Sequence, residues 1–201
     1  MTDALPESYT IALPAWLRAE LPALPEVLIG RDAQMELVHR LARRNFVEGN
    51  GGPFAAIVVE RETGRLVSAG VNVVLQSQIS SSHAEVVALG LAQTAIGSWN
   101  LRSDGVVRDL IVNWRPCVQC YGATFWSGAA GLVIAGSGPE LEEISTFDEG
   151  PVRDDWREQL VARGMTVESD VLREEALEVF REYRAAVDAA DVTVYNAAHD
   201  H

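Results

Sequence analysis

The chain has 201 residues, of which 29 are acidic and 16 are basic, and its formal net charge is −13. All 16 basic residues are arginine, which excludes chemistry that needs a lysine, such as a Schiff base or a phosphate-binding loop. The negative charge argues against a nucleic-acid partner, because nucleic-acid binding uses Lys and Arg to displace counterions from phosphates. The hydrophobic fraction of 48% is that of a globular domain able to bury a full core.

Sequence signals for export and for membrane insertion are missing. No apolar run approaches the roughly twenty residues that a membrane-spanning helix needs, so we expect no membrane partner. The start, Met1-Thr2-Asp3, lacks the basic and apolar pattern of a secretory signal. The two cysteines lie in one motif and are too few for a secreted, disulfide-stapled protein. We therefore expect a cytoplasmic protein.

In chain order, the first half predicts an extension, a helix and a hairpin. Four prolines and a short apolar helix make residues 1–30 an N-terminal extension. Apolar residues at spacings of three and four, from Met35 to Phe46, predict an amphipathic helix capped by Asp32. Two apolar runs, at 54–59 and 66–75, predict strands of a hairpin.

The second half alternates between helices and strands. Ser81 or Ser82 is expected to cap a helix that begins at His83. Pro116 suits the first position of a later helix, which runs to about Trp126. The remaining expected elements are strands at 109–113, 131–135 and 165–168, and helices at 152–163 and 171–190.

This order of elements predicts an α/β fold. Alternating strands and helices favour a sheet that is covered on both faces. We expect a three-layer α/β/α sandwich with a mixed five-stranded sheet, its first pair antiparallel and the rest mostly parallel. The main domain is expected to span 31–190, and the C-terminal tail 191–201.

Two short motifs carry the chemistry. The first is His83-Ala84-Glu85, and the second, roughly thirty residues later, is Pro116-Cys117-Val118-Gln119-Cys120. One imidazole and two thiolates, His83, Cys117 and Cys120, make a three-ligand zinc site that leaves one position open, as in catalytic sites. Cys120 lies one helical turn after Cys117, so both sulfurs face the same way.

The spacing leaves other interpretations to weigh. A closed structural zinc site needs a fourth Cys or His, and His39, His199 and His201 are not well placed for it. A redox Cys-x-x-Cys pair leaves the His-x-Glu motif unexplained.

An open zinc site points to hydrolysis. Zinc lowers the pKa of bound water to about 7, and the resulting hydroxide can attack a ring carbon that bears an amino group. A neighbouring carboxylate can carry the protons to the ring and to the leaving amine. Glu85 is that catalytic group by position.

The chain resembles the cytidine deaminase superfamily, in its guanine deaminase and tRNA-adenosine-deaminase-like branch. The matching segments lie between about 50 and 135, and comprise 51–59, 70–72, 83–85, 116–123 and Trp126. The resemblance implies that 31–190 is a zinc-dependent deaminase domain that releases ammonia from an aminated nucleobase or related heterocycle, with guanine the first guess. It also implies a homodimer.

The resemblance further assigns substrate-binding residues. Asn72 resembles the asparagine that hydrogen-bonds the base, Phe54 the aromatic that packs on the ring, and Trp126 a pocket tryptophan. Asp148, in Phe147-Asp148-Glu149, resembles an aspartate that contacts the substrate, and Ala84 lies between the metal ligand and the acid. In this branch the C-terminal segment can complete a neighbour's site, for which the candidates are Tyr195, His199 and His201, and a frayed tail is the alternative.

The chain departs from the family pattern just before the cysteines. Arg115 replaces the usual acidic residue, and Asn113 and Trp114 replace small residues. Arg115 either recognises a carboxylate or phosphate or forms a surface salt bridge. Two further possibilities stay open: deamination of another ring (cytosine, a nucleoside, a pterin or a triazine), and a catalytically silent zinc-binding partner protein.

Overall fold

The structure is a computed structural model that describes residues 5–195. One mixed sheet runs through it, with strand order β2-β1-β3-β4-β5. Strand β1 is antiparallel to β2 and β3, whereas β3, β4 and β5 are parallel. The expected mixed five-stranded sheet is confirmed. The strands are β1 (Ala55–Glu60), β2 (Leu66–Val71), β3 (Arg108–Val112), β4 (Gly131–Ile134) and β5 (Thr166–Glu168).

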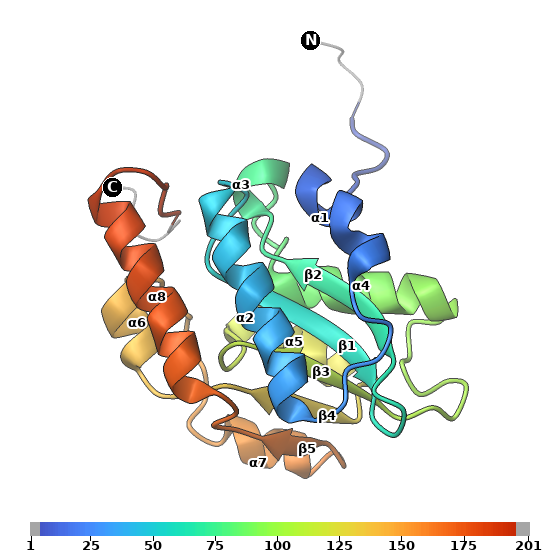
Figure 1. Ribbon diagram of the computed structural model, residues 1–201. Helices are drawn as coiled ribbons and strands as arrows, with labels where there is room; N and C mark the ends of the chain where they lie inside the picture. The colour runs from blue at the N-terminus through green and yellow to red at the C-terminus, as the bar shows by residue number, and fades with distance from the viewer. Residues whose placement is uncertain (1–4, 196–201) are drawn as a thin grey trace.

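Helices cover both faces of the sheet, which confirms the three-layer sandwich. Figure 1 shows α2 and α8 side by side in front of the strands, and α4 and α5 behind them. No helix in the described residues is long and apolar enough to cross a membrane. The helices are α1 (Ala15–Glu20), η1 (Leu21–Ala23, 3₁₀), α2 (Arg31–Val47), α3 (Val74–Ser77), α4 (Ala84–Ile96), α5 (Val118–Trp126), α6 (Glu140–Ser145), α7 (Trp156–Val161) and α8 (Arg173–Asp188).

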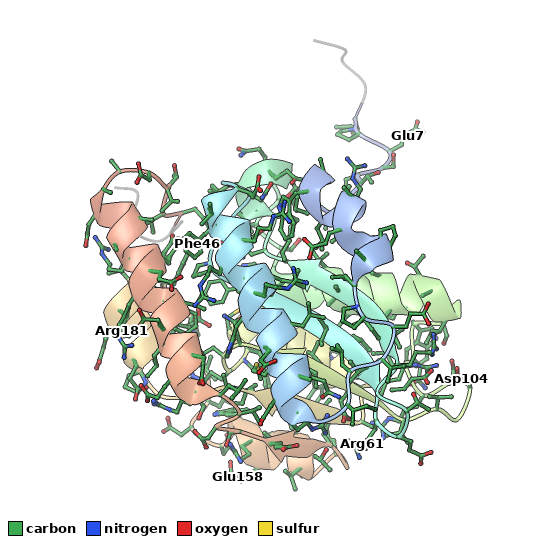
Figure 2. The ribbon with its side chains drawn as sticks, viewed as in Figure 1. Glu7, Phe46, Arg61, Asp104, Glu158 and Arg181 are labelled. Carbon is green, nitrogen blue, oxygen red and sulfur yellow. The ribbon has the colours of Figure 1, made fainter. Side chains whose placement is uncertain are left out.

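Strand β1 joins the two hydrophobic cores. Successive side chains of a strand point to opposite faces. Accordingly, Ile57 and Val59 pack in the core under α2 and α8, and Val58 packs in the core under α4. On the first face, Phe46 extends from α2 (labelled in Figure 2), and its ring meets the Tyr183 ring of α8 edge-on, with 5.5 Å between the ring centroids. Burial on both faces explains why this segment reads as a continuous apolar run.

The helix starts differ from the expected caps. Helix α4 begins at Ala84 with His83 as its N-cap, and no side chain caps it. Ser82 is buried and its hydroxyl pairs with that of Ser77 at 3.0 Å, so it is engaged elsewhere. Helix α2 starts at Arg31 after Gly30, which places Asp32 inside the first turn.

Helix α5 also starts later than predicted. It begins at Val118, with Pro116 before it and Cys117 as the N-cap. The Cys117 sulfur accepts from the Cys120 backbone N–H, which supplies the cap that a serine or aspartate usually provides.

Two segments form helices where the sequence predicted a strand or made no assignment. Strand β2 ends at Val71 instead of residue 75, because α3 follows at once. The Asn72 side-chain oxygen accepts from Val74 N at 3.2 Å and so starts this turn. Helix α6 was not predicted, and α7 is shorter than the expected 152–163. The division into 1–30, 31–190 and 191–201 stays a prediction.

Helix α4 lies close against β2 because residue 70 has no side chain. A Cβ on Gly70 would lie 2.5 Å from Ala88 N and 2.7 Å from Ala84 O, both backbone atoms of α4. We expect Gly70→Ala to lower the free energy of unfolding by about 1–3 kcal/mol, because it forces helix and strand apart.

Urea unfolding measures this change, and Gly90 provides the matched control. Gly90 lies in the same helix with nothing within 4 Å of an added Cβ. Gly90→Ala is expected to stabilise the chain by about 0.5–1 kcal/mol. Equal stability of Gly70→Ala and the parent chain would contradict the close packing.

Candidate metal centre and its cavity

The strand register gathers the site at one edge of the sheet. Ala55 pairs with Val71, and Ala56 pairs with Val112. Strand β1 therefore begins where β2 and β3 end. As a result, Phe54, Asn72 and the segment 113–120 leave the sheet side by side, although they are far apart in the sequence.

Three side chains meet there in a candidate metal-binding cluster. The ligand atoms of His83, Cys117 and Cys120 all lie within 4.8 Å of one another. His83 Nδ1 is 3.5 Å from Cys117 Sγ. No other group of three or more His, Cys, Asp or Glu residues within residues 5–195 is arranged to hold a metal ion. One nitrogen and two sulfurs in this arrangement suit zinc with one position left open.

The other histidines do not close this shell within the described chain. His39 is buried in α2, in the core layer that covers the opposite face of the sheet. Burial lowers its pKa to about 4, so it is a neutral packing residue near pH 7. His199 and His201 lie outside the described residues.

The surroundings of the cluster favour the thiolate form of Cys117. A hydrogen bond from the Cys120 thiol, together with His83, lowers the pKa of Cys117 to about 4 despite its burial. Burial alone would lower the pKa of His83, but the hydrogen bond and negative charge of Cys117 raise it. Burial raises the pKa of Cys120. Since the thiolate is the metal-binding form of cysteine, the lowered pKa of Cys117 suits it to bind a metal ion.

Glu85 lies beside the cluster in the first turn of α4. Its side chain is buried, and this burial, together with the charge of Cys117, raises its pKa to about 7. The carboxylate also hydrogen-bonds the Cys120 thiol, which places it next to a ligand. A carboxyl group that gains and loses a proton near pH 7 is suited to general acid–base work.

The cluster opens into a cavity of about 180 Å³. His83, Glu85 and Cys117 line one part of it. Four of the residues expected to contact substrate also line it, namely Phe54, Asn72, Arg115 and Asp148. Candidate metal ligands, the acid and the candidate recognition groups therefore share one cavity.

Two expected substrate contacts are not brought into this cavity. Trp126 is 73% exposed and lines a separate hollow with Tyr121 and Phe125. It ends α5, whose first turn holds Cys120, and a helix rises about 1.5 Å per residue, so its two ends lie far apart. Ala84 is fully buried in the core under α4 and is not among the residues that line the cavity.

Sequence reasoning missed Glu149. It lines the cavity and is buried, and its pKa is raised to about 8 by burial and by the charges of Cys117 and Glu85. The assignment had fallen on Asp148, which is exposed and accepts from Gly150 N at 2.8 Å. Two adjacent acids are visible in the sequence, but only the turn of the backbone decides which one is buried.

Two buried asparagines hold the cavity wall. Asn45 donates to the carbonyl oxygens of Gly52 (3.0 Å) and Asn72 (2.7 Å). Asn113 accepts from Ala55 N and donates to Pro53 O, which anchors the turn before β1. The departure at Asn113 thus has a structural role.

Tyr195, the last described residue, lines the cavity of its own chain. Its ring packs on Phe147 at 5.3 Å. Its hydroxyl hydrogen-bonds the Asn72 side chain and the Gly52 backbone. The resemblance suggests Tyr195 for a neighbour's site; within one chain it lines that chain's own cavity, and its place in a dimer stays a prediction.

Comparison with protein families supports this site. A family model described as the cytidine and deoxycytidylate deaminase zinc-binding region matches residues 30–136. Guanine deaminase of Bacillus subtilis (strain 168) is 32% identical over 101 residues, which is 50% of this chain and 60% of that protein. The tRNA-specific adenosine deaminase of Buchnera aphidicola subsp. Schizaphis graminum (strain Sg) is 33% identical over 99 residues, or 49% and 62%. The chain thus spans about three fifths of these relatives' length.

Solved structures match over nearly the whole chain. Guanine deaminase from Nitrosomonas europaea is 41% identical with a TM-score of 0.82, and the match covers 92% of this chain and 98% of that one. NE0047 in complex with 2,6-diaminopurine is 40% identical with a TM-score of 0.84, covering 96% and 98%. An NE0047 variant in complex with 8-azaguanine is 40% identical with a TM-score of 0.84, covering 91% and 100%.

Proposed function

The chain belongs to the cytidine and deoxycytidylate deaminase family, and we propose that it is a zinc-dependent hydrolytic deaminase of an aminated nucleobase, with guanine as its first substrate. One observation carries the proposal. One cavity is lined by two members of the candidate metal-binding cluster, His83 and Cys117, and by two buried acids, Glu85 and Glu149. A ligand cluster, an acid whose pKa is near 7 and a ring-sized space together suit hydrolytic deamination.

His83, Cys117 and Cys120 would hold the zinc ion. Their nitrogen and sulfur atoms are the donors that zinc prefers, and the lowered pKa of Cys117 supplies a thiolate. Bound there, zinc supplies a water molecule that loses its proton near neutral pH. The protein's own contribution is to place proton carriers and a ring-binding surface around it.

Glu85 is proposed to move the protons of the reaction. It accepts one from the attacking water and delivers protons to the ring nitrogen and to the leaving amine. A carbon–oxygen bond forms, the carbon–nitrogen bond breaks, and ammonia leaves. Glu149 provides a second buried carboxyl group in the same cavity.

The cavity suits a bare heterocycle. Its volume of about 180 Å³ is below the roughly 300–1,000 Å³ of pockets for drug-sized ligands. Phe54 offers a ring face and Asn72 a side-chain amide. The net charge of −13 disfavours a tRNA substrate. The relatives named as guanine deaminases support guanine as the first ring to test.

We also propose a homodimer in a reducing cytoplasm. The last turn of α5 presents Trp126, which is 73% exposed, and a second copy of the chain would cover it. Both cysteines are unpaired, as metal ligands must be. Sedimentation of a monomeric species at micromolar concentration would contradict the dimer.

Two other functions remain in competition. A catalytically silent zinc-binding partner would need the cluster but not the acids, and two buried acids with raised pKa values favour an enzyme. A thiol redox protein would pair Cys117 with Cys120, whereas both are free and gathered around His83.

A panel of rings tests the proposal. Zinc-loaded protein is incubated with guanine, adenine, cytosine, guanosine, cytidine, pterin and an aminotriazine, and ammonia is measured. We expect turnover of guanine and none of the nucleosides. Ammonia from cytosine, a nucleoside, the pterin or the triazine in place of guanine would show that another ring is the substrate. No ammonia from any compound would exclude the deaminase function.

A further inference from the structure

Arg115 lies between the cavity and a neighbouring hollow. It follows β3, two residues before Cys117, and its backbone N–H donates to Gly136 O at 2.8 Å. Its side chain lines both the cavity and an adjoining hollow of about 320 Å³ that also includes Glu142. Arg115 is therefore part of the wall between these two spaces.

The guanidinium of Arg115 has few hydrogen-bond and ion-pair partners for its N–H donors. Its side chain is 13% exposed, and its one ion pair within the described chain is Nη2 to Glu142 at 3.5 Å. Nη1 is shielded from water and has no hydrogen-bond partner among residues 5–195. The buried Arg108 also has an unpartnered Nε, but its two terminal nitrogens bind Leu101 O and both Asp104 oxygens at 2.7–2.8 Å. A buried charged donor without an acceptor costs free energy. A ligand that offered one more acceptor to Arg115 would remove that cost.

The charges around the cavity show which acceptor fits. Among residues 5–195, three carboxyl groups line it, those of Glu85, Asp148 and Glu149, and Arg115 is the one guanidinium that does. A carboxyl group always has an oxygen that accepts a hydrogen bond, so these acids suit the N–H edge of a heterocycle. A carbonyl oxygen on the same ring needs a donor, and the guanidinium of Arg115 is a donor at any working pH because it stays charged.

We propose that Arg115 determines substrate specificity by donating a hydrogen bond to a carbonyl oxygen of the bound ring. This inference rests on the proposed function, and it names the substrate class as heterocycles that carry both an amino and an oxo group. The acids hold the amidine edge of such a ring, and the guanidinium holds its oxygen. A ring with an amino group in place of that oxygen presents a donor to a donor and binds poorly.

Guanine and 2,6-diaminopurine isolate this contact, because they differ only in an oxo or amino group at one ring carbon. Their dissociation constants are measured by tryptophan fluorescence in a zinc-loaded Glu85→Gln background, in which neither compound is expected to be consumed. Adding Arg115→Met is expected to weaken guanine binding about 10- to 100-fold, as for loss of a charge-assisted hydrogen bond. Binding of 2,6-diaminopurine is expected to change by less than about 3-fold.

Glu142→Gln is the matched control, because it removes the ion pair and keeps the guanidinium. We expect it to preserve the preference for guanine. Parallel losses for both ligands in Arg115→Met, or the same change in Glu142→Gln, would show a structural role and overturn the inference. Zinc content and thermal midpoint are measured for every variant. Failure of the proposed function has a separate signature, namely no ammonia from the zinc-loaded wild-type protein with any ring.

Discussion

Glu85→Gln is expected to lower the rate of ammonia release by at least about 10²–10⁴-fold, while zinc content and fold stay as in the wild-type protein. The glutamine side chain has nearly the same size and shape, so it fits the same buried site at the start of α4. It has no proton to gain or lose near pH 7, whereas burial raises the pKa of Glu85 to about 7. Steady-state kinetics with guanine, together with metal analysis of the same sample, measures both parts of the prediction.

Glu62→Gln is the control for this substitution. Glu62 is exposed in the turn between β1 and β2, so its neutralisation removes one negative charge without touching the cavity. It should leave the rate within about twofold, as expected of a surface substitution. If Glu85→Gln retained full activity, the proton-transfer role would be lost, and the silent zinc-binding protein would become the better account.

Cys120→Ser is expected to remove zinc and activity together. Cys120 is fully buried and shares the cluster with His83 and Cys117, and a serine hydroxyl is a poor substitute for a thiolate ligand. Zinc sites bind with about 10–16 kcal/mol in zinc-finger peptides, so loss of one of three ligands should leave less than about a tenth of an equivalent bound. Metal analysis after dialysis measures this, and circular dichroism checks the fold.

The fold itself should survive this change. Two hydrophobic clusters on opposite faces of the sheet form without the metal, so the apo chain is expected to stay folded. His39→Gln is the control, because it replaces a buried histidine that lies outside the cluster. It should keep one zinc per chain. Full zinc occupancy in Cys120→Ser would mean that the metal lies elsewhere.

The sequence by itself indicated the proposed chemistry and determined the class of fold. Zinc binds nitrogen and sulfur ligands, and the proposed deamination needs an acid beside them. The His-x-Glu and Cys-x-x-Cys motifs supply both as residue types at short spacings. The alternation of apolar runs with amphipathic segments likewise fixed a covered sheet, since strand and helix periods are local properties. Even the two-sided burial of β1 is visible as an uninterrupted apolar run from Ala55 to Val59.

Tertiary structure alone decided which side chains reach the cavity. Glu149 and Asp148 both line it, but Glu149 is buried while Asp148 is exposed, because the direction of each side chain depends on the turn that ends at Gly150. Trp126 is carried away from the ligands by the length of α5, and Tyr195 returns to the cavity from the end of the chain. Such contacts join residues that are distant in sequence, so they depend on packing directions that residue type and spacing do not encode.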